Sequence, residues 1–390
     1  MDVLNAMNQT MLRSDTAADG HAGKADALAL RLRAVHRAVS DLKRGVPVML
    51  LSGDESLVVV PAETVGAAGL AEFAELLGGG AMLLLAPVRA AAVLRRPVEP
   101  NQAAIAVHVR PRLFHPDVLR SLADPTAEDI LPDEPLLTAT PPESAPAALA
   151  LMKLARLLPA ALVAPARADA AQRAETRHIL AVPAADVLDY PAAAATNLVR
   201  VAEAAVPLEG APDARVVAFR APDMGIEHLA ILVGRPENTT APLARVHSEC
   251  FTGDLLGSLR CDCGSQLRGA IARMAEDGAG VLLYLAQEGR GIGLVNKLRA
   301  YVMQDRGLDT LDANRALGWG ADERNFLIAA TMLHQLGIGG IRLLTNNPDK
   351  VAAMAACGVD AVREAHAFAP NGVNDTYLAT KAKRFGHLLG

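Results

Sequence analysis

The chain is poor in aromatic residues. Only 3% of its 390 residues are Phe, Trp or Tyr, whereas 51% are hydrophobic and 21% are charged. This balance is typical of a well-packed globular protein and excludes a largely disordered chain. Because large rings are scarce, the core must be built mainly from Ala, Leu and Val. A chain of this length has room for two or three domains.

The sequence also lacks an excess of positive charge and a long hydrophobic run. Its 38 Lys and Arg residues are outnumbered by 43 Asp and Glu residues, which gives a net charge of -5. A broad basic surface for nucleic acid is therefore not expected. The apolar runs at 81–87 and 157–163 are far shorter than the roughly 20 residues that span a membrane. A signal peptide contains a continuous apolar core, and the first thirty residues have none. We expect no nucleic-acid partner, no membrane contact and a cytoplasmic location.

Cysteine is scarce as well, and its distribution is uneven. Three of the four cysteines, Cys250, Cys261 and Cys263, form the spacing C-x10-C-x-C. In a long cytosolic chain a disulfide framework is not expected. A catalytic zinc site has three protein ligands and leaves the fourth position open, so three thiolates fit it. Two alternatives stay open on spacing alone: cysteines that only pack in the core, and a closed structural site in which His247 is the fourth ligand.

Helix and strand signals alternate along the chain. They predict an α/β (α+β) fold with two domains, each a mixed sheet with packed helices. A period near 3.6 predicts a helix over 26–43, and apolar runs predict strands at 46–51, 227–233 and 281–286. Crowded prolines predict a long loop over 124–147. The expected divisions are a disordered N-terminal tail at 1–25, a first domain at 26–192, a linker at 193–214 and a second domain at 215–390.

Three polar segments offer groups that bind anions. The segment EGRGIG at 288–293 lies between a predicted strand and a predicted helix, where backbone amides favour an anion. It matches neither the dinucleotide-binding pattern nor the P-loop pattern. The segment TNNPDK at 345–350 follows another strand, and RVHSE at 245–249 precedes the first cysteine. Taken singly, EGRGIG and TNNPDK are more typical of turns. The charged run at 322–324 is more typical of a solvated helix face.

Together these segments resemble GTP cyclohydrolase II in order and in spacing. The resemblance is carried by RVHSECFTGDLLGSLRCDCGSQL, YLAQEGRGIGLVNKLRAYVMQDRGLDT, DANRALGWGADERNF and LLTNNPDKV, and it ends at TYLATKAKRFGHLLG. It has no evident gap across the second domain. A match of this extent outweighs the separate alternatives for each segment.

The resemblance implies a set of roles. Cys250, Cys261 and Cys263 would hold one catalytic Zn²⁺ per subunit, and Mg²⁺ would bind with the GTP phosphates. Asp322 matches the family's proton acceptor, Arg324 its proposed nucleophile, and Tyr301 a tyrosine that supports ring opening. The residues implied to contact GTP are Arg245, Val246, His247, Ser248, Glu249, Gln266, Glu288, Gly289, Arg290, Thr310, Thr345 and Lys350. The resemblance also implies a homodimer.

The implied reaction converts GTP to 2,5-diamino-6-hydroxy-4-(5-phosphoribosylamino)pyrimidine, formate and pyrophosphate, the first step of riboflavin biosynthesis. Zinc would lower the pKa of bound water, and Arg290 and Lys350 suit a leaving pyrophosphate. Because a guanidinium stays protonated, Arg324 either loses a proton with the help of Asp322 or orients the α-phosphate. The alternatives are a GTP-binding pseudoenzyme and a variant cyclohydrolase that regulates or branches flavin supply.

The N-terminal half remotely resembles 3,4-dihydroxy-2-butanone 4-phosphate synthase. RGVPV at 44–48 and ILAVPAADVLDY at 179–190 are similar to that family's opening and closing segments. The family's acidic R-E-N-E-G-D-L loop is replaced by SGDESLVVV at 52–60, and its G-H-T-E-A segment is missing. Asp54 and Glu55 are expected to be ordinary surface turn carboxylates, so Mg²⁺ has no oxygen cage. We expect a degenerate domain without synthase activity that serves as a scaffold, a dimerisation surface or a regulator.

Overall fold

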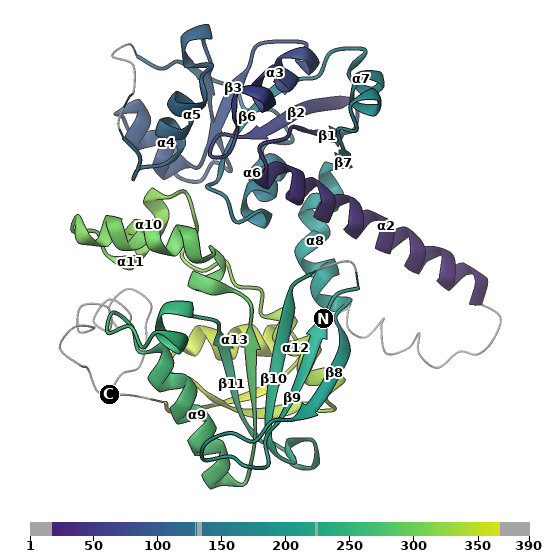
Figure 1. Cartoon of the computed structure of the whole chain (residues 1–390), viewed down its shortest axis with the longest axis vertical. Helices are drawn as coiled ribbons and strands as arrows, with labels where there is room; N and C mark the ends of the chain where they lie inside the picture. Colours follow the sequence, from purple (N-terminus) through teal and green to yellow (C-terminus); the bar gives the residue numbers. More distant parts are fainter. Residues whose placement is uncertain (1–17, 129, 131–134, 223–224, 367–390) are drawn as a thin grey trace.

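The computed structural model describes residues 18–128, 130, 135–222 and 225–366. The segment TYLATKAKRFGHLLG and residues 1–17 of the expected tail lie outside the described residues. Two mixed sheets of seven strands each, both covered by helices, confirm the predicted α/β architecture (Figure 1). Among the helices of the described ranges, none combines the length and the apolar character needed to cross a membrane.

The first sheet belongs to the N-terminal half and has the strand order β5-β4-β3-β6-β2-β1-β7. Neighbouring strands are antiparallel, except that β7 pairs with β1 in parallel. The strands are β1 (Val48–Ser52), β2 (Glu55–Pro61), β3 (Met82–Leu85), β4 (Ile105–His108), β5 (Thr138–Ala139), β6 (Ala160–Pro165) and β7 (Ala181–Pro183). The helices of this half are α2 (Ala18–Lys43), α3 (Ala67–Leu76), α4 (Pro87–Leu94), α5 (Pro116–Ala123), α6 (Ala145–Leu154), α7 (Ala170–Thr176) and α8 (Ala184–Thr196).

Strand β2 shows why this sheet is buried on both faces. Its side chains alternate between two apolar clusters: Val58 and Val60 belong to one, and Leu57 and Val59 to the other. Successive side chains of a strand point to opposite faces, so a strand that is apolar at every position needs a cover on each side. Helices α2, α6 and α8 cover one face and contribute to the second of these clusters.

Two expectations about the N-terminal half differ from the structure. Helix α2 begins at Ala18, inside the segment expected to be a disordered tail, because alanines such as Ala22 favour the helix despite two glycines. Asp54 does lie exposed in the turn between β1 and β2. Glu55, however, is half-buried and accepts hydrogen bonds from the backbone N–H and the hydroxyl of Ser144, 3.2 and 2.5 Å away. It therefore ties β2 to the start of α6 rather than serving as a turn carboxylate.

The second sheet has the strand order β14-β13-β11-β12-β10-β9-β8. Its strands are β8 (Val199–Ala205), β9 (Arg215–Arg220), β10 (Glu227–Gly234), β11 (Leu243–Ser248), β12 (Ala279–Leu285), β13 (Gly340–Leu344) and β14 (Asp360–Glu364). Its helices are α9 (Cys263–Asp277), α10 (Leu294–Asp305), α11 (Thr310–Ala316), α12 (Leu327–Gln335) and α13 (Pro348–Ala356). Strand β8 lies within the segment expected to be a linker, and it pairs with β9 at the edge of this sheet.

Strand β11 lies where the direction of the chain through the sheet reverses. From β11 the chain passes through α9 to β12 on one side, and it later returns to form β13 on the other side of β11. Both neighbours are parallel to β11. In α/β sheets a ligand typically binds beyond the carboxyl ends of parallel strands at such a switch point. The segments that follow β11, β12 and β13 are therefore the place to look for a site.

Helices α10 and α11 connect the two halves. Figure 1 shows them between the two sheets, below the N-terminal half. Met303 of α10, Ala313 of α11 and Trp319 after it belong to the same apolar cluster as Phe73 and Leu83 of the N-terminal half. Because part of the second half completes the core of the first, the two sheets share a packed interface.

A buried histidine on β10 predicts a pH dependence of stability. His228 accepts a hydrogen bond from the backbone N–H of Ala286, 3.1 Å away, and burial lowers its pKa to about 4, with Arg156 adding to the effect. The folded state disfavours protonation of His228, whereas the unfolded state binds that proton below pH 6.5. The contribution of His228 to the free energy of unfolding is therefore fully present above pH 6.5 and is lost as the pH drops towards 4. The loss is on the order of 3 kcal/mol.

We expect His228→Asn, which keeps an acceptor for Ala286, to flatten this decline in urea unfolding measured between pH 7 and pH 4. His366, whose pKa burial also lowers to about 4, leaves part of the slope in place. An unchanged slope in the variant would contradict the assignment.

Candidate active site

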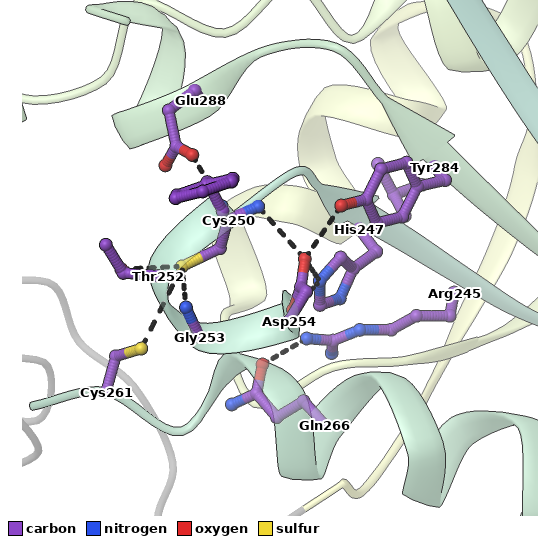
Figure 2. Close-up of polar contacts among 12 residues, drawn as sticks. Arg245, His247, Cys250, Thr252, Gly253, Asp254, Cys261, Gln266, Tyr284 and Glu288 are labelled. Atoms are coloured by element: carbon purple, nitrogen blue, oxygen red, sulfur yellow. Dashed lines mark hydrogen bonds and ion pairs between the residues drawn. The ribbon is translucent and has the colours of Figure 1, made fainter. Parts of the chain in front are cut away.

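Three cysteines gather at the carboxyl end of β11. Cys250 follows β11, Cys261 lies before α9, and Cys263 is the first residue of α9. Their sulfur atoms all lie within 4.8 Å of one another, and the Sγ atoms of Cys250 and Cys261 are 3.9 Å apart (Figure 2). Thiolates around a tetrahedral zinc, with Zn–S bonds of about 2.3 Å, lie about 3.8 Å apart. The donor set and its spacing therefore fit such an ion.

The turn between these cysteines brings the sulfurs together. The short π-helical turn η3 (Phe251–Leu255) follows Cys250, and the backbone N–H of Gly253 donates to the sulfur of Cys250 at 3.3 Å. A side chain at Gly253 would place its Cβ 2.6 Å from the sulfur of Cys261 and 3.0 Å from that of Cys250. Only glycine leaves room for the sulfurs at this position, which explains why the sequence has one there.

His247 lies outside the cysteine cluster. Its Nε2 is 3.1 Å from both carboxylate oxygens of Asp254, and its ring stacks on Tyr284 with centroids 5.6 Å apart. Tyr284 also donates its hydroxyl to Asp254 at 3.0 Å. In the part of the chain that the structure describes, the group able to hold a metal consists of the three cysteines alone. The arrangement favours a three-ligand site over one closed by His247.

Lys297 supports the cluster, and the sequence analysis missed it. Its ammonium nitrogen lies 2.9 Å from the sulfur of Cys250, 2.8 Å from the hydroxyl of Thr252 and 3.0 Å from the carboxylate of Glu288. Burial is the largest single effect and lowers the pKa of Lys297, but the hydrogen bonds and charge interactions with Cys250 and Glu288 together outweigh it, so the net shift is upward. The side chain therefore stays cationic and stabilises a thiolate. The sequence did contain one signal for this role. Lys297 lies one helical turn before Tyr301, so the two side chains lie on the same face of the helix.

Lys297 carries a testable expectation about the cluster. A cation that holds a ligand sulfur in place contributes to metal affinity in the way that outer groups do, by a factor of about 10–100. We expect Lys297→Met to weaken metal binding by that factor in a competition titration with a chelator. Lys43→Met, which removes an exposed lysine of α2, serves as control. An affinity in Lys297→Met equal to that of the control would refute the role.

The carboxyl ends of β11 and β13 hold a second group of polar side chains. Arg245 of β11 donates to the carbonyl oxygen of Leu344 at 2.8 Å and to the side chain of Gln266 on α9 (Figure 2). Lys350 of α13 donates to the carbonyl oxygen of Val246 at 3.1 Å. Burial lowers the pKa of Arg245 to about 10, which still leaves it charged near neutral pH. The hydroxyl of Ser248 is buried without a hydrogen-bond partner among the described residues.

The Gly-rich segment after β12 has an unusual backbone. Gly289, Arg290 and Gly291 have φ angles of 65°, 63° and 97°. Arg290 is the only non-glycine of the three, and an L-residue held in this region costs free energy unless its surroundings hold it there. The carboxylate of Glu288 accepts from the backbone N–H of Phe251 at 2.7 Å, which ties this segment to the cysteine turn.

Asp322 and Arg324 form an ion pair in which Nε of Arg324 is 2.8 Å from the Asp322 carboxylate. Burial is the largest single effect and raises the pKa of Asp322, but the hydrogen bonds and charge of Arg324, together with the charge of Arg290, outweigh it, and the pKa lies below its usual value. Asp322 is therefore ionised near neutral pH. Tyr301 lies between two cations, with the Arg260 guanidinium carbon 4.4 Å and Lys297 Nζ 5.8 Å from its ring centroid. Burial raises the pKa of Tyr301, so its phenol keeps its proton.

All eighteen residues proposed from the sequence line one cavity at these strand ends. They come from segments far apart in the chain, and eight further polar residues that were not among the proposed site residues lie beside them. The further residues are Arg260, Asp262, Lys297, Gln304, Asn314, Asn346, Asn347 and His366. The cavity joins the cysteine cluster to the cationic side chains of Arg290, Arg324 and Lys350. The arrangement suits a ligand that carries several negative charges and reacts near a metal.

Fold and site together define an α/β protein with a candidate metal centre at one end of an anion-binding pocket. The family model described as GTP cyclohydrolase II matches residues 199–366. The GTP cyclohydrolase-2 of Azospirillum brasilense is 50% identical over 366 residues, which cover 92% of this chain and 94% of that protein. The chain belongs to the GTP cyclohydrolase II family.

Two further comparisons cover different shares of the chain. The GTP cyclohydrolase-2 of Pasteurella multocida is 52% identical over 192 residues, which cover 49% of this chain and 87% of that protein. A solved two-domain 3,4-dihydroxy-2-butanone 4-phosphate synthase from A. baumannii covers 85% of this chain and 99% of its own, at 18% identity and a TM-score of 0.33. A TM-score this low supports no argument about the N-terminal half.

Proposed function

We propose that this chain is a zinc-dependent GTP cyclohydrolase II that converts GTP to 2,5-diamino-6-hydroxy-4-(5-phosphoribosylamino)pyrimidine, formate and pyrophosphate, the entry step to riboflavin. The observation that carries the proposal is one continuous cavity. It joins three sulfur atoms within 4.8 Å of one another to the side chains of Arg290, Arg324 and Lys350. Family membership supports GTP as the substrate.

Cys250, Cys261 and Cys263 would hold the zinc ion. When bound, zinc is a Lewis acid that lowers the pKa of water from about 15.7 towards 7, which supplies hydroxide near neutral pH. Three sulfur donors suit zinc better than Mg²⁺ or Ca²⁺, which prefer oxygen ligands. Lys297, 2.9 Å from the sulfur of Cys250, offsets part of the negative charge of the three thiolates.

Ring opening adds one water at C8 of guanine and breaks one of the two C–N bonds of that carbon, which leaves a formamide. A second water breaks the other C–N bond and releases C8 as formate. Tyr301 is suited to donate a proton to a ring nitrogen as its bond to C8 breaks, because burial raises its pKa and keeps the phenol protonated. The neighbouring cations Arg260 and Lys297 both lie against the tyrosine ring and help to hold it in place. The carboxylate of Glu249, whose pKa burial raises, lines the same cavity and is a second group able to move a proton.

Pyrophosphate leaves when a water molecule bonds to the α-phosphorus and the bond from that phosphorus to the oxygen bridging the α- and β-phosphates breaks. We propose that Arg324 binds the α-phosphate as a cation and does not act as a nucleophile. Its pairing with an ionised Asp322 stabilises the charged guanidinium, which has no lone pair available for attack. Arg290 and Lys350 would stabilise the charge on the leaving group, together with Mg²⁺ bound to the phosphates. Mass spectrometry of quenched protein should then show no GMP adduct; an adduct on Arg324 would reverse this assignment.

The remaining GTP contacts are proposed from their place in the cavity. Arg245, which is buried, and Ser248 lie on β11, Gln266 lies on α9, and Thr310 is the first residue of α11. Thr345 follows β13. The homodimer and the cytoplasmic location stay predictions from the family resemblance and the composition.

The test is incubation of the purified full chain with GTP, Zn²⁺ and Mg²⁺, with formate and pyrophosphate measured separately. We expect equal amounts of the two products and a pyrimidine of the stated mass. Binding of GTP without formate would replace the proposal with the pseudoenzyme, and a product that keeps C8 would replace it with a variant cyclohydrolase. Absence of both binding and turnover would end it.

A further inference from the structure

The two loops that carry the phosphate-binding arginines are joined to each other. The backbone N–H of Glu323 donates to the carbonyl oxygen of Arg290 at 3.0 Å. Glu323 lies between Asp322 and Arg324, so this bond links the segment after β12 to the segment before α12. The backbone at 289–291 has positive φ angles throughout, so the short 3-10 turn η4 (Glu288–Gly291) contains two residues, Gly289 and Arg290, whose backbone is not helical. Loops of this kind keep one conformation only when other parts of the molecule hold them.

The end of α6, in the N-terminal half, contacts both loops. Lys153 of α6 forms an ion pair with Glu323, with Nζ 2.5 Å from Oε1. The same carboxylate oxygen accepts from the backbone N–H of Gly320 at 2.7 Å, which closes the loop on itself. Lys153 also lies over the ring of Trp319, 5.7 Å from its centroid. The loop before α12 is therefore held by a side chain more than 150 residues earlier in the sequence.

Arg156 holds the other loop. It lies two residues beyond the end of α6, with a φ of 60°, and its guanidinium donates to the carbonyl oxygens of Gly291 and Ala286. Its own carbonyl oxygen accepts from Asn296, a fully buried residue of α10, at 2.9 Å. Arg156 thus crosses from the N-terminal half to the residue next to Arg290. A non-glycine residue with this backbone conformation is uncommon and is maintained here by contacts on both sides.

The consequence for catalysis follows from geometry. Groups that stabilise charge on a phosphate act only when they are held within about 0.5 Å of the productive arrangement, and a 1 Å displacement can cost about 100-fold in rate. One of the two loops carries Arg290, and the other carries Asp322 and Arg324. If their outer supports were removed, both would gain freedom together, because the bond between Glu323 and Arg290 couples them.

We propose that Lys153 and Arg156 are positioning residues, through which the N-terminal half holds Arg290, Asp322 and Arg324 in the arrangement that binds the phosphates. This inference rests on the proposed function of the site. It gives the N-terminal half a defined task as a scaffold of the active site. Neither residue touches the cavity that holds the cysteines, so neither is itself catalytic.

The experiment compares Lys153→Met, Lys153→Arg, Arg156→Met and Arg156→Lys in the full chain. Lys43→Met is the control. Lys43, Lys153 and Arg156 line one cavity between the two halves, but Lys43 forms no ion pair with another described residue. For GTP turnover we expect kcat/KM to fall about 10–100-fold in Arg156→Met and about 5–10-fold in Lys153→Met, with a raised KM. Lys153→Arg and Arg156→Lys should recover at least half of the loss on a logarithmic scale, and Lys43→Met should match the parent.

Two further readouts separate positioning from loss of structure and from failure of the proposed function. Bound metal per chain should stay unchanged in all variants, because the cysteine cluster does not depend on α6. The dissociation constant of inorganic pyrophosphate, measured without turnover, should rise in the two Met variants. If the parent does not turn over GTP, the proposed function fails, while pyrophosphate affinity still tests the positioning role. If the two Met variants keep the parental KM and pyrophosphate affinity, the positioning role is wrong. It is also wrong if the loss of activity in these variants only follows a loss of bound metal.

Discussion

Replacement of Cys261 by serine is expected to abolish stoichiometric metal binding and to lower formate production at least about 1000-fold, equivalent to about 4 kcal/mol in the barrier. The physical reason is the geometry of the cluster. The sulfur of Cys261 lies 3.9 Å from that of Cys250, and the three sulfurs form the metal-binding group found among the described residues. A serine hydroxyl is shorter, harder and protonated at neutral pH, so it does not replace a thiolate.

The matched control is Cys357→Ser. Cys357 is half-buried at the end of α13 and packs against the apolar core of the second sheet, outside the cavity. This variant should keep metal and activity. Elemental analysis after gel filtration and a formate assay measure both quantities. If Cys261→Ser keeps one metal ion per chain together with parental turnover, the three-cysteine site is wrong.

Arg299→Ala is expected to cost about 3–5 kcal/mol of unfolding free energy, the largest stability effect among the ion pairs discussed here. Arg299 of α10 reaches into the N-terminal half, where its guanidinium lies 2.9 Å from Glu63 and 2.8 Å from Asp124. The side chains of these three residues are only 17%, 11% and 7% exposed. Removing the arginine leaves two buried carboxylates without their cation, which costs more than the ion pair itself contributes.

Arg31→Ala provides the comparison for Arg299→Ala. Arg31 of α2 pairs with Asp186 of α8, but its side chain is 47% exposed, and an exposed pair contributes roughly 0–1 kcal/mol. Urea unfolding followed by circular dichroism measures both variants. Glu63 and Asp124 keep hydrogen bonds from Leu158 and Thr126, which limits the loss in Arg299→Ala to the lower part of the range. If the two variants lose the same free energy, the buried network does not hold the two halves together.

Local sequence signals predicted much of the second half. The helix predicted after the segment 288–293 is present as α10, which begins at Leu294, and the strand predicted at 227–233 ends one residue before β10 does. Alternating and continuous apolar runs mark strands regardless of where they lie in the fold. The cysteine cluster was predictable for a similar reason. Its members lie close together in the chain, and glycines such as Gly253 let the backbone fold them onto one point.

Other parts of the fold had no local signal. Strand β8 lies in the segment that was expected to be a linker. All seven of its residues are exposed, and a strand held mainly by backbone hydrogen bonds to β9 needs no pattern of buried apolar residues. His247 could not be assigned from spacing, since its pairing with Asp254 and stacking on Tyr284 depend on how η3 folds back on β12. Glu55 was placed in a turn because its partner, Ser144, lies 89 residues away.

The sequence by itself determined the chemistry available to this protein: three thiolates at a spacing that suits one metal, basic side chains after three strands, and a family that joins them to GTP. Tertiary structure alone decided how these groups are held. Lys297 reaches Cys250, Arg299 enters the N-terminal half, and Arg156 supports the loop of Arg290 only after whole helices have packed. Such contacts join residues far apart in the chain, and their free energy depends on burial and orientation, neither of which leaves a pattern in neighbouring residues.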